Sequence, residues 1–212
     1  MDIIRPYTSL SIPDDWEKLS SDCPYQFVLM KNPSPEYEYV SEAYFKSMTA
    51  QIKNIWRVQN IDLWNFYSAK KQQLKNIKGI DPNEHMLFHG TNSQYVESIC
   101  TYNFDYRLSG NHASVYGKGI YFANRARYAS QYCYIDKVLD LAHKQTYKLI
   151  LARVIVGEIT QGQSYYTRPP QKSFHKLTYY DTCVNNVLTP TIYIVFDPNQ
   201  IYPEYVIEFT NI

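Results

Sequence analysis

Cysteine is scarce in this 212-residue sequence, and its spacing excludes the usual cysteine-based sites. The four cysteines are Cys23, Cys100, Cys133 and Cys183, and none of them belongs to a CxxC pair. A structural zinc site needs Cys and His side chains clustered at ligand spacing, and no such cluster is visible, so we expect no metal site. Because the sequence also shows no secretory signal, we expect the cysteines to be reduced thiols rather than disulfides.

Long hydrophobic runs are also absent. No segment reaches the roughly 20 consecutive apolar residues that a membrane-spanning helix requires. Residues 1–16 are polar and interrupted by prolines, and they lack the apolar region of a targeting peptide. We therefore expect a soluble protein of the cytoplasm, the nucleus or both, with no membrane partner.

A strong excess of charge of either sign is lacking too, since the formal net charge is +1. Such a chain has no overall positive field of the kind that drives non-specific nucleic-acid binding, so we expect no nucleic-acid partner for this domain. Tyrosine, by contrast, is abundant, with 22 residues against 9 Phe and 3 Trp. Some of these flat, hydroxyl-bearing rings could line a pocket for a flat polar ligand, although most are expected to be ordinary core and surface residues.

The order of strand-like and helix-like patterns predicts the fold class. The length and the hydrophobic content of 45% suit one folded domain with its own core. The expected strands are 25–31, 52–58, 85–89, 120–123, 148–156, 191–196 and 205–209, and the expected helices are 37–49, 63–74, 94–100 and 126–133. We expect loops at 108–118 and 162–176, a turn at 197–203, and an extended lead-in over 1–22 before a domain that spans 23–212. Because helices dominate early and strands late, the predicted class is α+β rather than repeated strand–helix–strand units.

Three segments concentrate residue types that can carry chemistry: FHGT at 88–91, YGKGIYFA at 116–123 and TIYIVF at 191–196. Taken singly, each is a weak signal. A His-Gly pair after a strand has many structural explanations. The GKG sequence lacks the Lys-Ser/Thr of a phosphate-binding loop and the third glycine of a dinucleotide fingerprint, so Gly117 and Gly119 could reflect turn geometry alone.

Taken together and in order, these segments resemble the paired NAD-binding motifs of the poly(ADP-ribose) polymerase catalytic domain. Further segments fall in the family's order: Arg57-Val58-Gln59-Asn60 with Leu63-Trp64 and Tyr67, Asn103-Phe104-Asp105, Tyr179 to Val184, and Tyr202-Pro203-Glu204-Tyr205. The resemblance runs from about residue 24 to the end. It is strongest to the mono-ADP-ribosylating branch that includes the CCCH zinc-finger members and the zinc-finger antiviral protein. It implies the ADP-ribosyltransferase fold, with two packed, mainly antiparallel sheets and flanking helices.

The resemblance also implies roles for individual residues. NAD would bind as a substrate, His89 would donate a hydrogen bond to one of its ribose hydroxyls, and the Gly90 main chain would pair with the nicotinamide amide. Tyr121 and Tyr132 would pack on the two faces of the nicotinamide ring, and Thr91 would lie near the adenosine side. The residues implied for NAD binding are His89, Gly90, Thr91, Tyr116, Tyr121, Ala129 and Tyr132.

Two positions depart from the family pattern, and both bear on activity. Family members that make polymer carry a Glu that organises ribose hydroxyls and activates the acceptor. Ile192 occupies that position of the catalytic set, beside His89 and Tyr121. A single transfer to an acceptor with its own nucleophile is then expected, but chain elongation is not. Ala129 replaces a Ser whose hydroxyl usually bonds the nicotinamide amide, which predicts weaker NAD binding unless the neighbouring Ser130 or water compensates.

Two functions remain open at this point. The first is an active, monomeric mono-ADP-ribosyltransferase that moves ADP-ribose from NAD to a protein side chain and releases nicotinamide. The second is a catalytically silent module of the same fold that serves as a scaffold in antiviral or RNA-linked assemblies. His89 favours the first and Ala129 the second. Glu204 is not counted as a catalytic acid, because it belongs to the next strand in the family's order. An unrelated tyrosine-rich binding domain is a distant third alternative.

Overall fold

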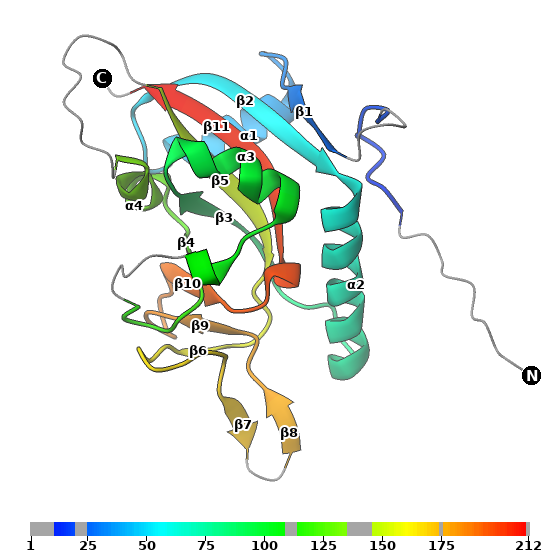
Figure 1. The fold of residues 1–212 in the computed structure, drawn as a ribbon, viewed down its shortest axis with the longest axis vertical. Helices are drawn as coiled ribbons and strands as arrows, with labels where there is room; N and C mark the ends of the chain where they lie inside the picture. Colours follow the sequence, from blue (N-terminus) through cyan, green and yellow to red (C-terminus); the bar gives the residue numbers. More distant parts are fainter. Residues whose placement is uncertain (1–10, 20–24, 109–113, 135–145, 174–175, 211–212) are drawn as a thin grey trace, which may run out of the picture.

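The computed structural model describes residues 11–19, 25–108, 114–134, 146–173 and 176–210 (Figure 1). Cys23, residues 1–10 and 20–22 of the expected lead-in, and residues 109–113 of the expected loop lie outside the described residues. Within the described ranges, no helix is both long enough and apolar enough to cross a membrane.

Among the described residues, nine strands form one sheet in the order β1-β2-β11-β5-β3-β4-β10-β9-β6. Neighbouring strands run antiparallel except β6 and β9, which are parallel. A large, mainly antiparallel sheet with helices against it confirms the expected α+β class. The strands are β1 (Tyr25–Leu29), β2 (Gln51–Asn60), β3 (Glu84–Gly90), β4 (Ile120–Ala123), β5 (Thr146–Ile155), β6 (Ile159–Gln161), β9 (Thr182–Val184), β10 (Ile192–Val195) and β11 (Ile201–Thr210).

The sheet is weakest between β3 and β4. The pair Phe88↔Ala123 is what joins these two strands, whereas β3 pairs with β5 all the way from Glu84 to Gly90. The sheet therefore has two halves, β1-β2-β11-β5-β3 and β4-β10-β9-β6, which form the upper and lower parts of the molecule in Figure 1. In place of the two packed sheets that were expected, the described residues form this one continuous sheet and a separate two-stranded sheet. Because the two strands part after Phe88, the next residues of β3, His89 and Gly90, lie where the halves diverge.

In the described part of the chain, four α-helices flank the sheet: α1 (Pro35–Phe45), α2 (Ile61–Lys78), α3 (Ser93–Tyr102) and α4 (Ala126–Ser130). Side-chain oxygens of Ser34, Asn60 and Asn92 accept N–H hydrogen bonds at the starts of α1, α2 and α3, where a helix leaves backbone donors unpaired. Helix α2 ends at Gly79, whose φ of 75° lies in the left-handed region that favours glycine. Figure 1 shows α3 in front of the central strands and α2 along one side.

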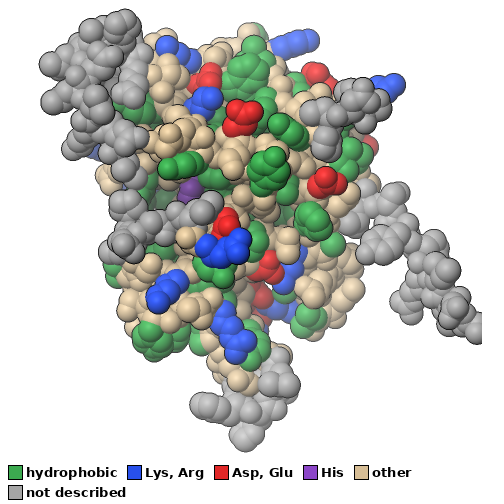
Figure 2. Space-filling model, in the orientation of Figure 1, with side chains coloured by type: hydrophobic (Ala, Val, Ile, Leu, Met, Phe, Trp, Pro, Cys, Tyr) green, Lys and Arg blue, Asp and Glu red, His purple; other side chains and the backbone are tan. Residues whose placement is uncertain are grey.

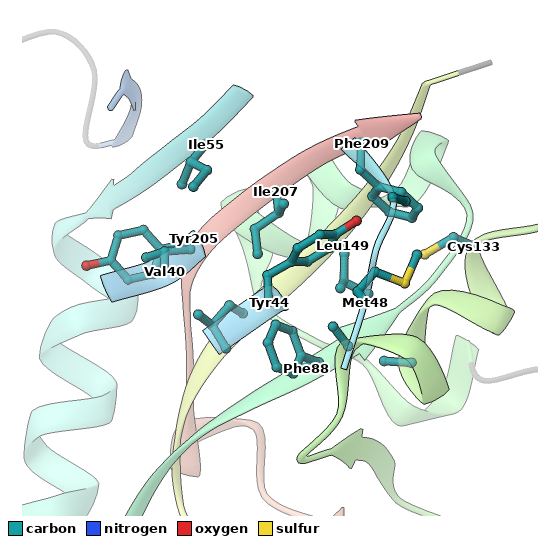
Figure 3. Packing of buried hydrophobic residues seen from close by; sticks show 14 of the residues in the cluster. Val40, Tyr44, Met48, Ile55, Phe88, Cys133, Leu149, Tyr205, Ile207 and Phe209 are labelled. Carbon is teal, nitrogen blue, oxygen red and sulfur yellow. The ribbon is translucent and has the colours of Figure 1, made fainter. Parts of the chain in front are cut away.

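The core lies on both faces of the sheet. Along β5, Leu149 and Leu151 join a buried cluster with α1, whereas Ile150 between them joins a second cluster with α3. This alternation follows from the two-residue period of a strand. Figure 3 shows the first cluster, in which Tyr44 of α1 lies against the sheet and its ring is 6.0 Å from that of Phe209. Helices α1 and α3 are thereby fixed to opposite faces.

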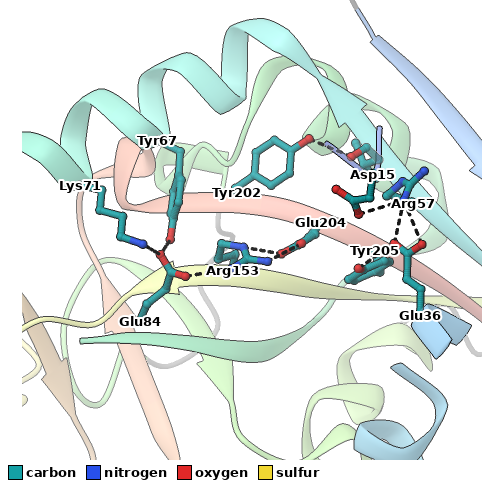
Figure 4. A network of polar contacts seen from close by, with 11 residues as sticks. Asp15, Glu36, Arg57, Tyr67, Lys71, Glu84, Arg153, Tyr202, Glu204 and Tyr205 are labelled. Atoms are coloured by element: carbon teal, nitrogen blue, oxygen red, sulfur yellow. Dashed lines mark hydrogen bonds and ion pairs between the residues drawn. The ribbon is translucent and has the colours of Figure 1, made fainter. Parts of the chain in front are cut away.

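Residues 11–19 pack onto the domain although they form no helix or strand. Trp16 stacks on Tyr202 with ring centroids 6.1 Å apart, and it lies 5.9 Å from the ring of Trp64. Asp15 forms an ion pair of 3.1 Å with the buried guanidinium of Arg57 (Figure 4). This part of the expected lead-in therefore contributes to the packed core around α2.

The secondary structure departs from the expectations at several places. The stretch 162–176, expected to be a loop, contains β7 (Gln171–Ser173), which pairs with β8 (Lys176–Tyr179) in a separate hairpin. The turn expected at 197–203 is shorter, because β11 begins at Ile201 and includes Pro203. Proline normally argues against a strand, but Pro203 lies at an irregularity in the pairing with β5, where it can be tolerated. The helix expected at 126–133 divides into α4 and a 3-10 turn at Gln131–Tyr134.

Candidate functional site

The segments singled out in the sequence meet where β3 and β4 part. Strand β3 ends with His89 and Gly90, β4 carries Tyr121, and α4 follows β4 after two residues. Strand β10 pairs with the other edge of β4 and places Ile192 opposite Ala123. The candidate site is therefore built from the end of β3, from β4 and α4, and from the start of β10.

His89 is held by a hydrogen bond between its ring and a neighbouring strand. Its Nδ1 lies 2.8 Å from the carbonyl oxygen of Tyr121, and the rings of Phe104 and Phe122 lie 4.9 and 5.5 Å from the imidazole. A carbonyl oxygen can only accept, so Nδ1 carries the hydrogen and Nε2 of the neutral ring is left as an acceptor. Burial lowers the pKa of His89 to about 4, although the hydrogen bond with Tyr121 works in the opposite direction.

This geometry bears on the role expected for His89, which stays a prediction. A neutral ring whose one N–H is committed to Tyr121 cannot also donate to a ribose hydroxyl, but its Nε2 can accept a hydrogen bond from one. The sequence predicted the residue but not the direction of the hydrogen bond, because the tautomer depends on a partner 32 positions away in the chain.

Gly90 has no room for a side chain. A β-carbon at this position would lie 1.7 Å from the carbonyl oxygen of Ala129 and 2.7 Å from its carbonyl carbon, with Cβ of Tyr132 at 3.2 Å. The two nearest atoms belong to the backbone of α4, so they cannot rotate away as a side chain would. The end of β3 and α4 are thus in direct contact, and this contact sets how Gly90 and Tyr132 lie relative to each other.

The hydroxyl of Tyr121 is fixed by the loop that precedes its own strand. It donates to the carbonyl oxygen of Gly117 at 2.9 Å and accepts from the N–H of Tyr116 at 3.0 Å. Burial raises the pKa of Tyr121, and the N–H of Tyr116 opposes this shift. Tyr121 therefore presents a neutral, half-buried ring, which is held by the backbone of β4 at one end and by the hydrogen bonds of its hydroxyl at the other. Tyr116 contributes to the site through its backbone.

Tyr132 and Thr91 lie at the edge of this group. The side chain of Tyr132 is 40% exposed, which leaves its ring accessible, and its hydroxyl lies 3.3 Å from that of Tyr128. Burial raises the pKa of the Cys133 thiol to about 12 although a hydrogen bond with the Thr91 backbone opposes the shift, so this thiol stays protonated and unreactive.

Ser130 does not replace the hydroxyl that Ala129 lacks. Its Oγ donates to the carbonyl oxygen of Arg127 at 3.0 Å and lies 3.7 Å from the sulfur of Met48, just after α1. Ala129 itself is buried and belongs to the cluster on the α1 face of the sheet. The compensation considered from the sequence is therefore not made by Ser130, whose hydroxyl is engaged toward α1.

The position of Ile192 is fixed by Asn185. The Oδ1 of Asn185 accepts from the N–H groups of Thr191 and Ile192, each at 3.0 Å, and its Nδ2 donates to the hydroxyl of Thr191 at 2.9 Å. No Asp or Glu occurs from residue 182 to residue 196 of the sequence. Asn185 was not singled out from the sequence, because an Asn before a strand signals only a turn.

Glu204, which was not counted as a catalytic acid, is engaged in a separate network (Figure 4). Its carboxylate forms two hydrogen bonds with Arg153, of 2.6 and 2.7 Å, and Arg153 also bonds Glu84 at 2.9 Å. Tyr67 and Lys71 of α2 complete the network on Glu84. Burial alone would raise the pKa of Glu84, but hydrogen bonds from Lys71, Tyr67 and Arg153 lower it. The network joins α2, β3, β5 and β11, which gives Glu204 a structural role.

The arrangement offers neutral polar groups and aromatic surfaces rather than metal ligands. No group of three or more His, Cys, Asp or Glu side chains that could hold a metal ion is present in the part of the chain that the structure describes. His89 supplies an acceptor, Gly90 a backbone free of side-chain bulk, and Tyr121 and Tyr132 two ring surfaces. These features suit a flat polar ligand.

Comparison with known proteins agrees with this geometry. The family model of the poly(ADP-ribose) polymerase catalytic domain matches residues 34–211, which include every residue of the candidate site. The chain belongs to this family. Membership in the poly(ADP-ribose) polymerase catalytic-domain family confirms the resemblance drawn from the motifs.

Individual relatives place the chain within the poly(ADP-ribose) polymerase family. It is 44% identical to protein mono-ADP-ribosyltransferase PARP11 of Mus musculus, over 95% of this chain and 65% of that protein. It is 39% identical to protein mono-ADP-ribosyltransferase PARP12 of Homo sapiens, over 95% of this chain and 28% of that protein. It is 34% identical to zinc finger CCCH-type antiviral protein 1 of Mus musculus, over 53% of this chain and 12% of that protein. The chain thus spans about two thirds of the length of PARP11 and a smaller part of the other two proteins.

Proposed function

We propose that the chain transfers a single ADP-ribose group from NAD to a protein side chain, with release of nicotinamide. One observation carries this proposal. A neutral His89 contacts Tyr121, whose hydroxyl is fixed, and the strand paired with β4 carries Ile192, which has no carboxylate. The relatives PARP11 and PARP12 bear the name mono-ADP-ribosyltransferase, which supports the same activity.

The residues of the site fit NAD as a substrate. Nε2 of His89 can accept a hydrogen bond from a ribose hydroxyl, and the absence of a side chain at Gly90 allows a ligand to approach the backbone closely. The ring of Tyr121 offers a flat surface for nicotinamide, and stacking on an aromatic ring contributes about 0.5–1.5 kcal/mol beyond the burial of area. Tyr132 supplies a second ring surface on the exposed side.

The same residues limit the chemistry to one transfer. Bound NAD supplies a ribose carbon on which positive charge builds as the bond to nicotinamide breaks. His89 acts there as a hydrogen-bond acceptor that orients the sugar, and Ile192 can neither take nor give a proton. The acceptor must therefore bring a nucleophile that needs no base at neutral pH, such as the carboxylate of Asp or Glu. Adding a second unit would require a ribose hydroxyl to lose a proton, for which Ile192 offers no base.

Incubation of the full chain with radiolabelled NAD, followed by gel electrophoresis and measurement of released nicotinamide, tests this proposal. We expect label at the mass of the chain itself or of an added acceptor protein. A ladder of longer products would contradict the single transfer. His89→Ala is the control, and it should lose the label while its melting temperature shows that it still folds.

A catalytically silent module of the same fold is the second candidate function. It is favoured by Ala129, whose missing hydroxyl Ser130 does not replace, and by the similarity to zinc finger CCCH-type antiviral protein 1. Any ligand that binds the folded chain must raise its melting temperature. A chain that neither gains thermal stability from NAD or a benzamide-type inhibitor nor releases nicotinamide would support the silent module.

A further inference from the structure

A groove of about 220 Å³ lies at the base of the β7–β8 hairpin, which forms the lower end of the molecule in Figure 1. Residues 165–171 and Tyr179 line this groove, which we call the tyrosine groove. Its lining combines three tyrosine rings, two prolines and one charged side chain, that of Arg168. The residues expected to bind NAD are not among its lining residues, so the tyrosine groove is a second surface.

The tyrosine rings of this groove are accessible to a ligand. The side chain of Tyr165 is 70% exposed, and its ring meets that of Tyr166 edge to face, with the ring centroids 4.9 Å apart. Tyr179 adds a third ring from β8. Isolated exposed aromatic side chains are ordinary on a protein surface, whereas aromatic rings gathered in one groove are typical of a binding interface.

The backbone that carries these rings is fixed by hydrogen bonds to neighbouring segments. The carbonyl oxygen of Tyr166 accepts from the N–H of Lys118 at 2.8 Å, and that of Pro170 accepts from the N–H of Tyr180 at 3.2 Å. Pro169 and Pro170 also restrict their own φ angles through their rings. The tyrosine groove is therefore preformed, and little loss of freedom in this chain opposes the binding of a ligand.

The charge of the tyrosine groove has one sign. The guanidinium of Arg168 lies 4.4 Å from the centroid of the Tyr179 ring, and its Nη2 donates to the Tyr179 hydroxyl at 3.1 Å. Within the described part of the chain Arg168 forms no ion pair, and no Asp or Glu occurs from residue 159 to residue 180 of the sequence. On the lower part of the face shown in Figure 2, basic side chains lie next to hydrophobic ones. An acidic group of a ligand is therefore attracted to Arg168.

These properties favour a peptide over a nucleic acid. A nucleic acid binds through several phosphates and needs several cations, whereas Arg168 is the one charged side chain that lines the tyrosine groove. A groove of about 220 Å³ also buries little of any ligand, so it favours a ligand that loses little conformational freedom on binding. A polyproline II segment meets this condition, because its extended form is already populated and its carbonyl oxygens are free to accept from tyrosine hydroxyls.

We propose that the tyrosine groove binds a proline-rich, polyproline II segment of a partner protein that carries an acidic residue beside its prolines. The rings of Tyr165, Tyr166 and Tyr179 pack against the prolines, and Arg168 binds the carboxylate. The inference adds a protein-binding surface to the chain and does not depend on the proposed transfer of ADP-ribose.

Three fluorescent peptides test the tyrosine groove by anisotropy titration with the full chain. The acidic proline peptide has the core Pro-Pro-Ala-Pro-Pro followed by Glu-Glu. The basic proline peptide ends in Lys-Lys instead, and the acidic glycine peptide has Gly in place of each Pro. The acidic proline peptide should bind at least about tenfold more tightly than either of the others, because it alone combines a preformed extended backbone with the matching charge.

Two variants assign this binding to named side chains. Tyr165→Ser should weaken binding of the acidic proline peptide about fivefold or more, because an aromatic contact is lost. Arg168→Glu should reverse the order of the acidic and basic proline peptides, which a purely structural role of Arg168 would not do. Tyr102→Ser is the matched control, since this tyrosine is 80% exposed at the end of α3, which packs against β2, β5 and β11. It should change none of the affinities, and the melting temperature of each variant shows that it folds.

Three results would overturn the inference. An acidic glycine peptide that binds as tightly as the acidic proline peptide would reduce the binding to charge attraction. Equal affinities of the acidic and basic proline peptides for the wild type, or binding that a folded Tyr165→Ser variant retains in full, would remove the groove as the site. Tighter binding of a single-stranded oligothymidylate than of any peptide, lost in Tyr165→Ser, would assign the tyrosine groove to nucleic acid instead.

Discussion

Adding one methyl group at Gly90 is expected to displace α4 and disable the site. The new β-carbon would lie 1.7 Å from the carbonyl oxygen of Ala129 and 2.7 Å from its carbonyl carbon. Comfortable contact between such atoms begins near 3.4 Å, so the end of β3 and α4 must separate by about 1.5 Å or more. Both obstructing atoms belong to the backbone, so α4 has to move, and Tyr132 follows directly after it.

Gly90→Ala should lose little stability but much activity. Over-packing of a well-packed region costs about 1–3 kcal/mol of unfolding free energy. In a chain of this length each kcal/mol lowers the melting temperature by about 2–4 °C, so we expect a decrease of roughly 2–12 °C. A displacement of about 1 Å at a reaction site can lower turnover on the order of 100-fold. We therefore expect Gly90→Ala to lose at least about 100-fold in nicotinamide release at a temperature where it is fully folded.

Gly79→Ala is the control for Gly90→Ala, because at Gly79 alanine strains the backbone but meets no neighbouring atom. Gly79 has a φ of 75° and no atom within 4 Å of the position of an added β-carbon. Alanine there should cost about 1 kcal/mol for the left-handed conformation and leave turnover unchanged. Scanning fluorimetry and nicotinamide release are measured on both variants. Wild-type turnover and melting temperature in Gly90→Ala would refute the idea that close contact between β3 and α4 positions the site.

Restoring a hydroxyl with Ala129→Ser should tighten binding of a benzamide-type inhibitor about 2–10-fold, equivalent to the roughly 0.5–1.5 kcal/mol of one neutral hydrogen bond. Titration calorimetry measures the change, and an unchanged affinity would mean that the amide is already satisfied. The folded pKa of His89, about 4, lies below its ordinary value of about 6.5, so the unfolded chain binds the proton first as the pH falls. The stability that the neutral ring provides is complete above about pH 6.5 and is lost between about pH 6.5 and 4. Urea unfolding at both ends of this window should depend less on pH in His89→Ala than in the wild type, and equal dependence would contradict a half-buried neutral ring. Glu204→Gln should lower the melting temperature by weakening the contact with Arg153, while nicotinamide release stays within about threefold of wild type. A loss of about 100-fold in a folded Glu204→Gln variant would instead identify Glu204 as a catalytic acid.

Local sequence patterns predicted most of the helices and strands. The prediction failed where contacts between distant segments decide the secondary structure. Helix α2 was expected because its apolar residues recur on one face over several turns, and strand β5 was expected because residues 148–156 form a long, nearly continuous apolar run. Strands β6 and β9 have three residues each and exist only because a partner strand pairs with them. Pro203 entered β11 through an irregularity in its pairing with β5, which no local rule indicates.

The sequence by itself determined the family, the α+β class and which residues gather at the candidate site, because these follow from residue types in a fixed order along the chain. It also determined the absence of a carboxylate at Ile192 and of a hydroxyl at Ala129. Only the tertiary structure decided how these residues can act. The hydrogen bond that Nδ1 of His89 donates to the Tyr121 carbonyl leaves Nε2 of the neutral ring as an acceptor, and Met48 and the Arg127 carbonyl engage the hydroxyl of Ser130.

Away from the candidate site, too, the tertiary structure decided roles that the sequence alone did not indicate. Arg153 draws Glu204 into a structural network, and Trp16 becomes part of the core by stacking on Tyr202. Each of these outcomes depends on a partner far away in the chain. Spacing along a sequence specifies which face of a helix or strand a side chain occupies, but the tautomer, hydrogen-bond direction and charge pairing of that side chain depend on which distant atoms the folded chain brings within about 3 Å.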